Sequence, residues 1–142
     1  MRVLKFDERF RDDVEIGVKT QSVRREAKCR IGDPVLLCSD DGTPLAASKV
    51  VGLDTIQINP TCMYINGKLL LSILHSRDCD QTDNEFAQND GFEGFMEMAD
   101  WFESTYGPLP FHGVIIRWHP NVSAPDNLIT PARPHPTNRR ET

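Results

Sequence analysis

A series of short β-rich segments separated by tight-turn residues constrains the fold more than any other feature of the sequence. Asn66-Gly67 stands between the apolar runs 62–65 and 68–73, and Asp40-Asp41-Gly42 separates the run 35–38 from a longer one at 46–58. Dipeptides of the Asn-Gly and Asp-Gly type favour the two-residue turns of β-hairpins. Gly52 within the longer run indicates a bulge or a barrel corner. A string of short strands with tight turns is typical of a small barrel or sandwich.

A strand and a helix are expected before this series, at residues 2–6 and from Asp7 onward. Asp7 suits a helix N-cap, and Phe6, Phe10 and Val14 repeat at helical spacing as one apolar stripe. Gly17 stands where a glycine in the left-handed conformation ends a helix. The segment 17–25 is therefore expected to be a loop fixed at its start by a helix, a common setting for binding residues.

Helical spacing replaces the strand pattern after residue 83. Residues 83–89 predict a short helix that Gly91 breaks, and a second helix is expected from about Phe92 to Tyr106. Residues 113–118 are apolar enough to form a central strand. The sequence therefore predicts an α+β fold, in which a small barrel or sandwich of strands is flanked by helices.

One domain is expected from a chain of 142 residues. We assign residues 1–119 to this domain. Few large apolar residues follow, so residues 120–142 are expected to be an extended or disordered tail. Its prolines are Pro120, Pro125, Pro131, Pro134 and Pro136.

The charge pattern limits the class of partner. A formal net charge of −5 argues against bulk, non-specific binding of nucleic acid, which needs a broad basic surface. The cations nevertheless gather between residues 19 and 30, which leaves room for a local basic pocket. Acidic side chains recur between residues 77 and 105, where a solvated helix face is the simpler interpretation.

Membrane and metal sites are not expected. No apolar run approaches the ~18 residues of a transmembrane helix. The N-terminus lacks the apolar core of a signal peptide, so a cytoplasmic protein is expected. Cysteine and histidine spacings show no pattern of zinc ligands, and no metal or other cofactor is predicted.

Groups able to hold a phosphate or attack a carbonyl are concentrated in residues 17–25. Lys19 is either an ordinary solvated lysine or, with a pKa lowered by burial or by nearby arginines, a general base. Ser22 is either a turn residue or the nucleophile of a Ser–Lys arrangement. Thr20, Gln21, Arg24 and Arg25 are candidates for substrate binding.

Two further points concern geometry. In an extended segment Arg24 and Arg25 would point in opposite directions, so that only Arg24 shares a face with Ser22. Asp90, between the two expected helices, is either a cap of the helix that follows it or the acid/base partner of Lys19.

The segment Gly17-x-Lys19-Thr20-x-Ser22-x-Arg24-Arg25 resembles the signature of the ASCH family, which carries a G-x-K-T-x-T-x-R core after its first helix. Asp90-Gly91-Phe92, Trp101-Phe102 and Tyr106-Gly107 resemble the second half of that family, in the same order. The likeness covers about residues 2–119. The K-T-Q-x-x-R-R and D-G-F segments are also similar to small proteins carried by phages and prophages.

This resemblance implies a PUA-like β-barrel, with a cleft beside residues 19–25 that takes RNA, a nucleotide or a nucleoside. Family members include amidohydrolases that deacylate acetylcytidine, with a Lys, a Thr and a Glu as catalytic set, and reported ribonucleases. The matching positions here are Lys19, Ser22 and Asp90, so the second and third differ from the family. A non-enzymatic phage-type protein that binds a host protein is the alternative.

Overall fold

The computed structural model describes residues 1–70 and 82–119. The predicted tail and the last residues of the predicted strand 68–73 lie outside these ranges. The elements in chain order are β1 (Arg2–Phe6), the 3-10 helix η1 (Glu8–Phe10), α1 (Arg11–Glu15), β2 (Gln21–Arg24), β3 (Pro34–Ser39), β4 (Pro44–Ile58), β5 (Met63–Ile65), β6 (Lys68–Leu70), α2 (Asp83–Asn89), α3 (Phe95–Tyr106) and β7 (Phe111–Trp118). The predicted α+β class is confirmed.

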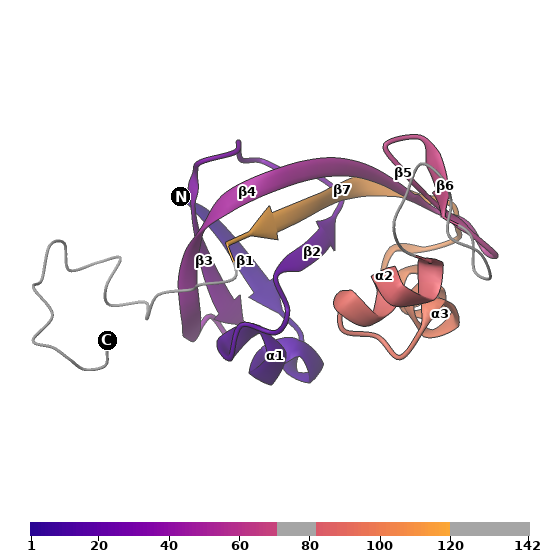
Figure 1. The fold of residues 1–142 in the computed structure, drawn as a ribbon. Coiled ribbons are helices and arrows are strands. Elements are labelled where there is room, and N and C mark those ends of the chain that lie inside the picture. The colour runs from indigo at the N-terminus through magenta and orange to yellow at the C-terminus, as the bar shows by residue number, and fades with distance from the viewer. Residues whose placement is uncertain (71–81, 120–142) are drawn as a thin grey trace, which may run out of the picture.

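The long strand β4 organises the sheet, as Figure 1 shows. Its first part pairs with β3, and its second part pairs with β7 and β5, all antiparallel. The register against β7 shifts between Val50 and Gly52, which confirms the irregularity predicted at that glycine. Such a bulge bends a strand and increases its twist. One strand therefore joins two differently oriented parts of the sheet.

The predicted closed barrel is wrong, because the seven-stranded sheet of the described residues is open. In this part of the chain β1 pairs only with β3, in parallel, and β2 pairs only with β7. A side-chain hydrogen bond connects β1 and β2, in which the Arg24 guanidinium donates to the Lys5 carbonyl at 2.7 Å. Strand propensity predicts where strands form, but it does not determine which edges pair.

The turns follow the sequence closely. Asn66 and Gly67 have φ angles of 52° and 82°, as a two-residue hairpin turn of the predicted kind requires. Gly17, with φ of 86°, follows the last residues of α1 as expected. The segment after it is only partly a loop, since residues 21–24 form β2. The second predicted helix begins at Phe95, three residues later than expected.

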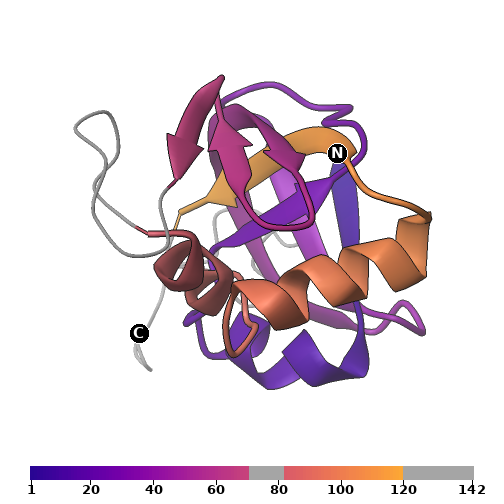
Figure 2. The same ribbon diagram turned by 90° about the vertical axis from the view of Figure 1, so that its right-hand side faces the viewer.

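Figure 1 shows α2 and α3 below the end of the sheet that contains β5 and β6, and α1 below the opposite end. In Figure 2 helix α3 crosses in front of the sheet. Aromatic side chains connect η1 with the α2–α3 region. The centre of the Phe10 ring lies 5.4 Å from that of Phe92 and 6.2 Å from that of Trp101, and both contacts are edge-on. An ion pair of 2.9 Å between Arg9 and Glu97 links η1 to α3. Among the described residues no helix is long and apolar enough to cross a membrane.

Candidate ligand pocket

The backbone at the end of α1 places Lys19. Gly17 turns the chain out of the helix, and the Lys19 amide then donates to the Asp13 carbonyl at 2.9 Å. The Lys19 side chain passes inward, so that only 3% of its surface is exposed. Its ammonium lies 4.9 Å from the centre of the Phe10 ring, a cation–π distance. The interpretation of Lys19 as a solvated lysine is therefore wrong.

The end of α2 places Asp90. The helix finishes in a Schellman arrangement, because the Phe92 amide donates to the Ala87 carbonyl at 2.9 Å and the Gly91 amide to the Gln88 carbonyl at 3.0 Å. Gly91, with φ of 102°, takes the left-handed position that this arrangement requires. Asp90 caps α2, rather than the following helix as the sequence alternative had it, and is itself 3% exposed.

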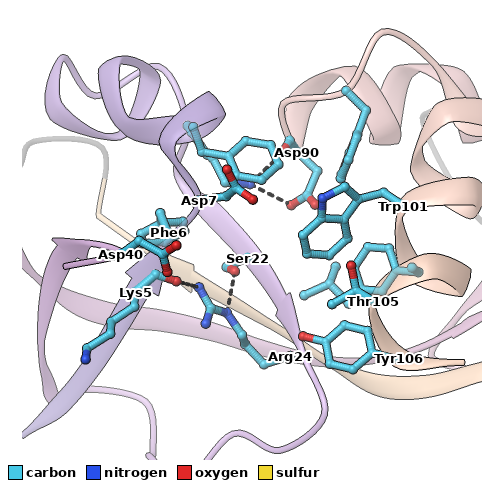
Figure 3. Close-up of a pocket in the computed structure, with 15 residues that line it drawn as sticks. Lys5, Phe6, Asp7, Ser22, Arg24, Asp40, Asp90, Trp101, Thr105 and Tyr106 are labelled. Atoms are coloured by element: carbon cyan, nitrogen blue, oxygen red, sulfur yellow. Dashed lines mark hydrogen bonds and ion pairs between the residues drawn. The ribbon is translucent and has the colours of Figure 1, made fainter. Parts of the chain in front are cut away.

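Lys19 and Asp90 form a buried ion pair (Figure 3). The Lys19 ammonium donates to Asp90 Oδ1 at 3.1 Å, and it also donates to the Asp90 backbone carbonyl. That carbonyl belongs to the C-terminal end of α2, where the helix dipole favours a cation. Gln21 donates its side-chain amide to the same carboxylate oxygen at 3.4 Å. Two distant parts of the chain, residues 19–21 and the end of α2, thus meet at one carboxylate.

Burial changes the acid–base properties of both groups. Removal from water lowers the pKa of Lys19 and outweighs the opposing effect of Asp90. Burial likewise raises the pKa of Asp90 against the attraction of Lys19. Both shifts favour the neutral forms, so Lys19 is more readily deprotonated than a surface lysine. A general base needs this property at neutral pH.

Ser22 and Arg24 lie on one face of β2, as the two-residue spacing predicts. Arg24 Nε donates to Ser22 Oγ at 2.8 Å, and the guanidinium lies 5.0 Å from the centre of the Phe6 ring. The Ser22 hydroxyl accepts this bond, and its own proton remains available for donation. No hydrogen bond joins Ser22 to Lys19 in this geometry, although both line the same cavity.

These side chains line a cavity of about 260 Å³ between β1 and β2 on one side and α3 on the other. Figure 3 shows Trp101, Thr105 and Tyr106 on one side of it and Ser22 and Arg24 on the other, with the Lys5 side chain pointing away. Aromatic rings form much of its wall: Phe6, Phe10, Phe92, Trp101, Phe102 and Tyr106. The charged side chains that line it include both signs: Lys5, Asp7, Lys19, Arg24, Asp40 and Asp90. Aromatic walls with a few polar groups suit a planar ligand with a polar edge.

The other predicted binding residues lie outside this cavity. Gln21 is buried behind Asp90, and Thr20 uses its carbonyl to accept a hydrogen bond from the Trp118 amide at 3.0 Å. Arg25 donates to the Tyr106 carbonyl at 3.1 Å and lines a second cavity. The pocket itself therefore contains four of the seven predicted residues: Lys19, Ser22, Arg24 and Asp90.

Sequence reasoning missed most of the cavity wall. Lys5, Asp7, Asp40 and Thr105 line it from segments that carry no motif. For Phe10 the helical spacing predicts only an apolar stripe, and for Phe102 and Tyr106 the sequence offers the family resemblance but no role in a cavity wall. The helical spacing does not indicate that residues of η1 and α3 border the same cavity.

Residues 1–70 and 82–119 contain no group of three histidine, cysteine or carboxylate side chains that could hold a metal ion. Comparison of the chain with protein-family models, with curated proteins and with solved structures gave no match.

Proposed function

We propose that this protein binds the heterocycle of a nucleoside, a nucleotide or an RNA residue in the 260 Å³ pocket. The proposal includes membership of the ASCH family, for which the Lys19 and Asp90 segments of the sequence are the argument. The observation that carries it is the buried Lys19–Asp90 pair in a cavity with aromatic walls.

The pocket chemistry fits a base better than an aliphatic ligand. Proteins recognise unpaired bases by stacking them on aromatic rings and by hydrogen bonds to their polar edges. Trp101 and Tyr106 supply partly exposed rings, and Ser22, Arg24 and Thr105 supply polar groups between them. In this proposal the base lies against the α3 rings with its polar edge toward β2.

A second function, hydrolysis of an amide on the bound base, is favoured by one contact. Arg24 donates to Ser22 Oγ at 2.8 Å, so a positive charge already faces the oxygen that would become the nucleophile. In the proposed reaction Ser22 Oγ attacks the acyl carbonyl and neutral Lys19 accepts the hydroxyl proton. Lys19 then returns this proton to the leaving amine as the C–N bond breaks. Water hydrolyses the resulting acyl-serine ester, which releases the acid and restores Ser22.

Binding is tested by calorimetric titration of the protein with ribonucleosides. Trp101→Ala is expected to weaken binding by about tenfold or more, since stacking contributes ~1–3 kcal/mol per base. Met96→Ala on the exposed side of the same helix is the control and is expected to bind normally. If none of the ribonucleosides or their monophosphates binds the wild-type protein, the proposed function is wrong.

Catalysis is tested separately by incubation with N4-acetylcytidine and, in parallel, with short RNAs. Ser22→Ala is expected to abolish deacylation while base binding persists, and Ser48→Ala, which lies outside the pocket, serves as control. Cleavage of RNA without deacylation would instead support the ribonuclease. A protein that binds neither nucleosides nor RNA but retains a protein partner would support the host-binding alternative.

A further inference from the structure

A second, more open cavity of about 200 Å³ adjoins the pocket and shares Arg24 and Tyr106 with it. We call it the basic groove. Its lining is Arg2, Arg24, Arg25, Glu26, Lys28 and Tyr106. Four of these six side chains are cationic, in a chain whose formal net charge is −5. The basic groove therefore concentrates positive charge in a chain that is acidic overall.

Backbone carbonyls hold two of the arginines in place. Arg25 donates to the Tyr106 carbonyl at 3.1 Å, and its guanidinium lies 4.9 Å from the centre of the Tyr106 ring. Arg2 Nε donates to the Ala27 carbonyl at 2.9 Å. A guanidinium has five N–H donors, so each of these groups keeps donors for a ligand while its direction is fixed.

No ion pair neutralises this charge within the described part of the chain. The carboxylates of Asp54, Asp90 and Glu97 form ion pairs elsewhere in the described residues, and none of the three lines the groove. Glu26 is the one acid in the lining. Burial lowers the pKa of Arg24, and the positive charge of Arg2 lowers it further, so the two guanidinium groups repel each other. An anion between them would remove this repulsion.

Fixed guanidinium groups with free donors suit a phosphate, which they bind through parallel hydrogen bonds. Because Arg24 and Tyr106 border both cavities, a ligand that spans them would place its planar part in the pocket and its anionic part in the groove. A nucleotide has this arrangement, since its phosphate and base are attached to one sugar.

We infer that the basic groove binds a phosphate attached to the ligand of the pocket, so that the ligand is a nucleotide unit, free or within RNA, and not a nucleoside. This inference rests on the proposed function and adds the substrate class. It assigns Arg2 and Lys28 a role in binding and places Arg25 in the groove rather than at the base.

The test compares each ribonucleoside with its 5′- and 3′-monophosphates and with dinucleotides, by calorimetric titration at low and high salt. The phosphate is expected to raise affinity at low salt by about tenfold or more, because its hydrogen bonds to charged groups of the groove add to the contacts of the base. High salt is expected to reduce the gain. Preference for the dinucleotide over both monophosphates would identify RNA, and the reverse would identify a free nucleotide.

Charge-neutral variants connect the gain to the groove. Arg25→Gln and Lys28→Gln are expected to remove most of the phosphate gain and to leave nucleoside affinity unchanged, whereas Arg25→Lys keeps part of it. Arg30→Gln, in the same basic run but outside both cavities, is the matched control and is expected to behave as wild type.

The two failures are distinguishable. If nucleosides and nucleotides bind equally, or if Arg25→Gln keeps the phosphate gain, the groove is not the phosphate site and the inference is overturned while the proposed function stands. If no nucleoside or nucleotide binds, both are overturned together.

Discussion

At the scale of single residues, the Lys19–Asp90 pair is the most informative contact in the molecule. Both side chains are 3% exposed, and their separation of 3.1 Å is that of a hydrogen-bonded ion pair. Burial of two charges costs several kcal/mol per ion, which mutual attraction repays only in part. A pair of this kind is poor evidence for stability and better evidence for a site that uses it.

Removal of one partner is expected to destabilise the protein more than removal of both. Lys19→Met leaves a buried carboxylate without its cation, and we expect it to cost ~3–5 kcal/mol of unfolding free energy. The double variant with Asp90→Asn is expected to cost clearly less than the sum of the two single variants. Urea denaturation of the four proteins measures the coupling. Additive losses would show that the two side chains do not act as a pair.

The pH dependence of stability tests the direction of the two pKa shifts. The folded-state pKa of Asp90 lies above its ordinary value of 3.8, so the Asp90 contribution is present at low pH and lost as pH rises through the folded value. The folded-state pKa of Lys19 lies below 10.5, so the Lys19 contribution is present at high pH and lost as pH falls through the folded value.

The stability of the wild type relative to the Lys19→Met/Asp90→Asn variant is therefore expected to be lowest at intermediate pH. The difference in unfolding free energy should pass through a minimum between the two folded-state pKa values. Denaturation curves over a series of pH values check this. A maximum at intermediate pH would mean that attraction outweighs burial in the folded protein.

At the scale of elements, the site depends on where two helices stop. Gly17 follows α1 and leads directly to Lys19, and Gly91 follows α2 directly after Asp90. The strand β2 then places Ser22 and Arg24 on one face by its two-residue repeat. The site is therefore assembled from element ends, which fix backbone direction more firmly than a long loop would.

Gly91→Ala is expected to damage the pocket more than the replacement by alanine of a glycine with a similar φ angle outside the pocket. A Cβ at Gly91 would lie 2.8 Å from the Phe10 ring, while one at Gly32, outside the pocket, meets nothing within 4 Å. Their φ angles are 102° and 96°, so both replacements carry the left-handed strain of ~1–2 kcal/mol. Gly91→Ala adds the displacement of Phe10, which packs on Lys19.

Urea denaturation and nucleoside titration of both glycine variants measure the difference. The Gly91 variant should lose more stability than the Gly32 variant and should bind nucleosides more weakly. Equal losses in the two proteins would mean that Phe10 moves aside at no cost and that its position does not matter to the pocket.

At the scale of the whole molecule, charge is distributed unevenly. The chain carries a formal net charge of −5, yet the basic groove collects four cations. A field of this shape attracts a short anionic ligand to one place and repels a long one elsewhere. The arrangement agrees with recognition of one or two nucleotides rather than of an extended strand.

RNA affinity is accordingly expected to level off at short length. A 12-nucleotide RNA should bind less than about tenfold more tightly than a dinucleotide, because few further phosphates meet a cation. Competition measured by fluorescence anisotropy, with the same terminal residues in both ligands, provides the comparison. A steep and salt-dependent increase with length would reveal a broad basic surface and contradict this expectation.

The sequence by itself determined the local features of this protein. The positions of the strands other than β2, the Asn66-Gly67 hairpin and the helix end at Gly17 were predicted because turn geometry depends on adjacent residues. Strand β2 lies in a segment expected to be a loop. The shared face of Ser22 and Arg24 was predicted for the same reason, since a strand repeats every two residues. The choice of Lys19, Ser22, Arg24 and Asp90 for one site came from residue type and motif, and all four line one cavity.

Only the tertiary structure decided how distant segments meet. Lys19 and Asp90 are 71 positions apart, and their contact depends on the packing of Phe10 against Phe92. The open sheet, the aromatic wall from α3 and the basic groove also depend on edge pairing and packing between elements. Such contacts depend on the burial of whole faces, which no short stretch of sequence encodes.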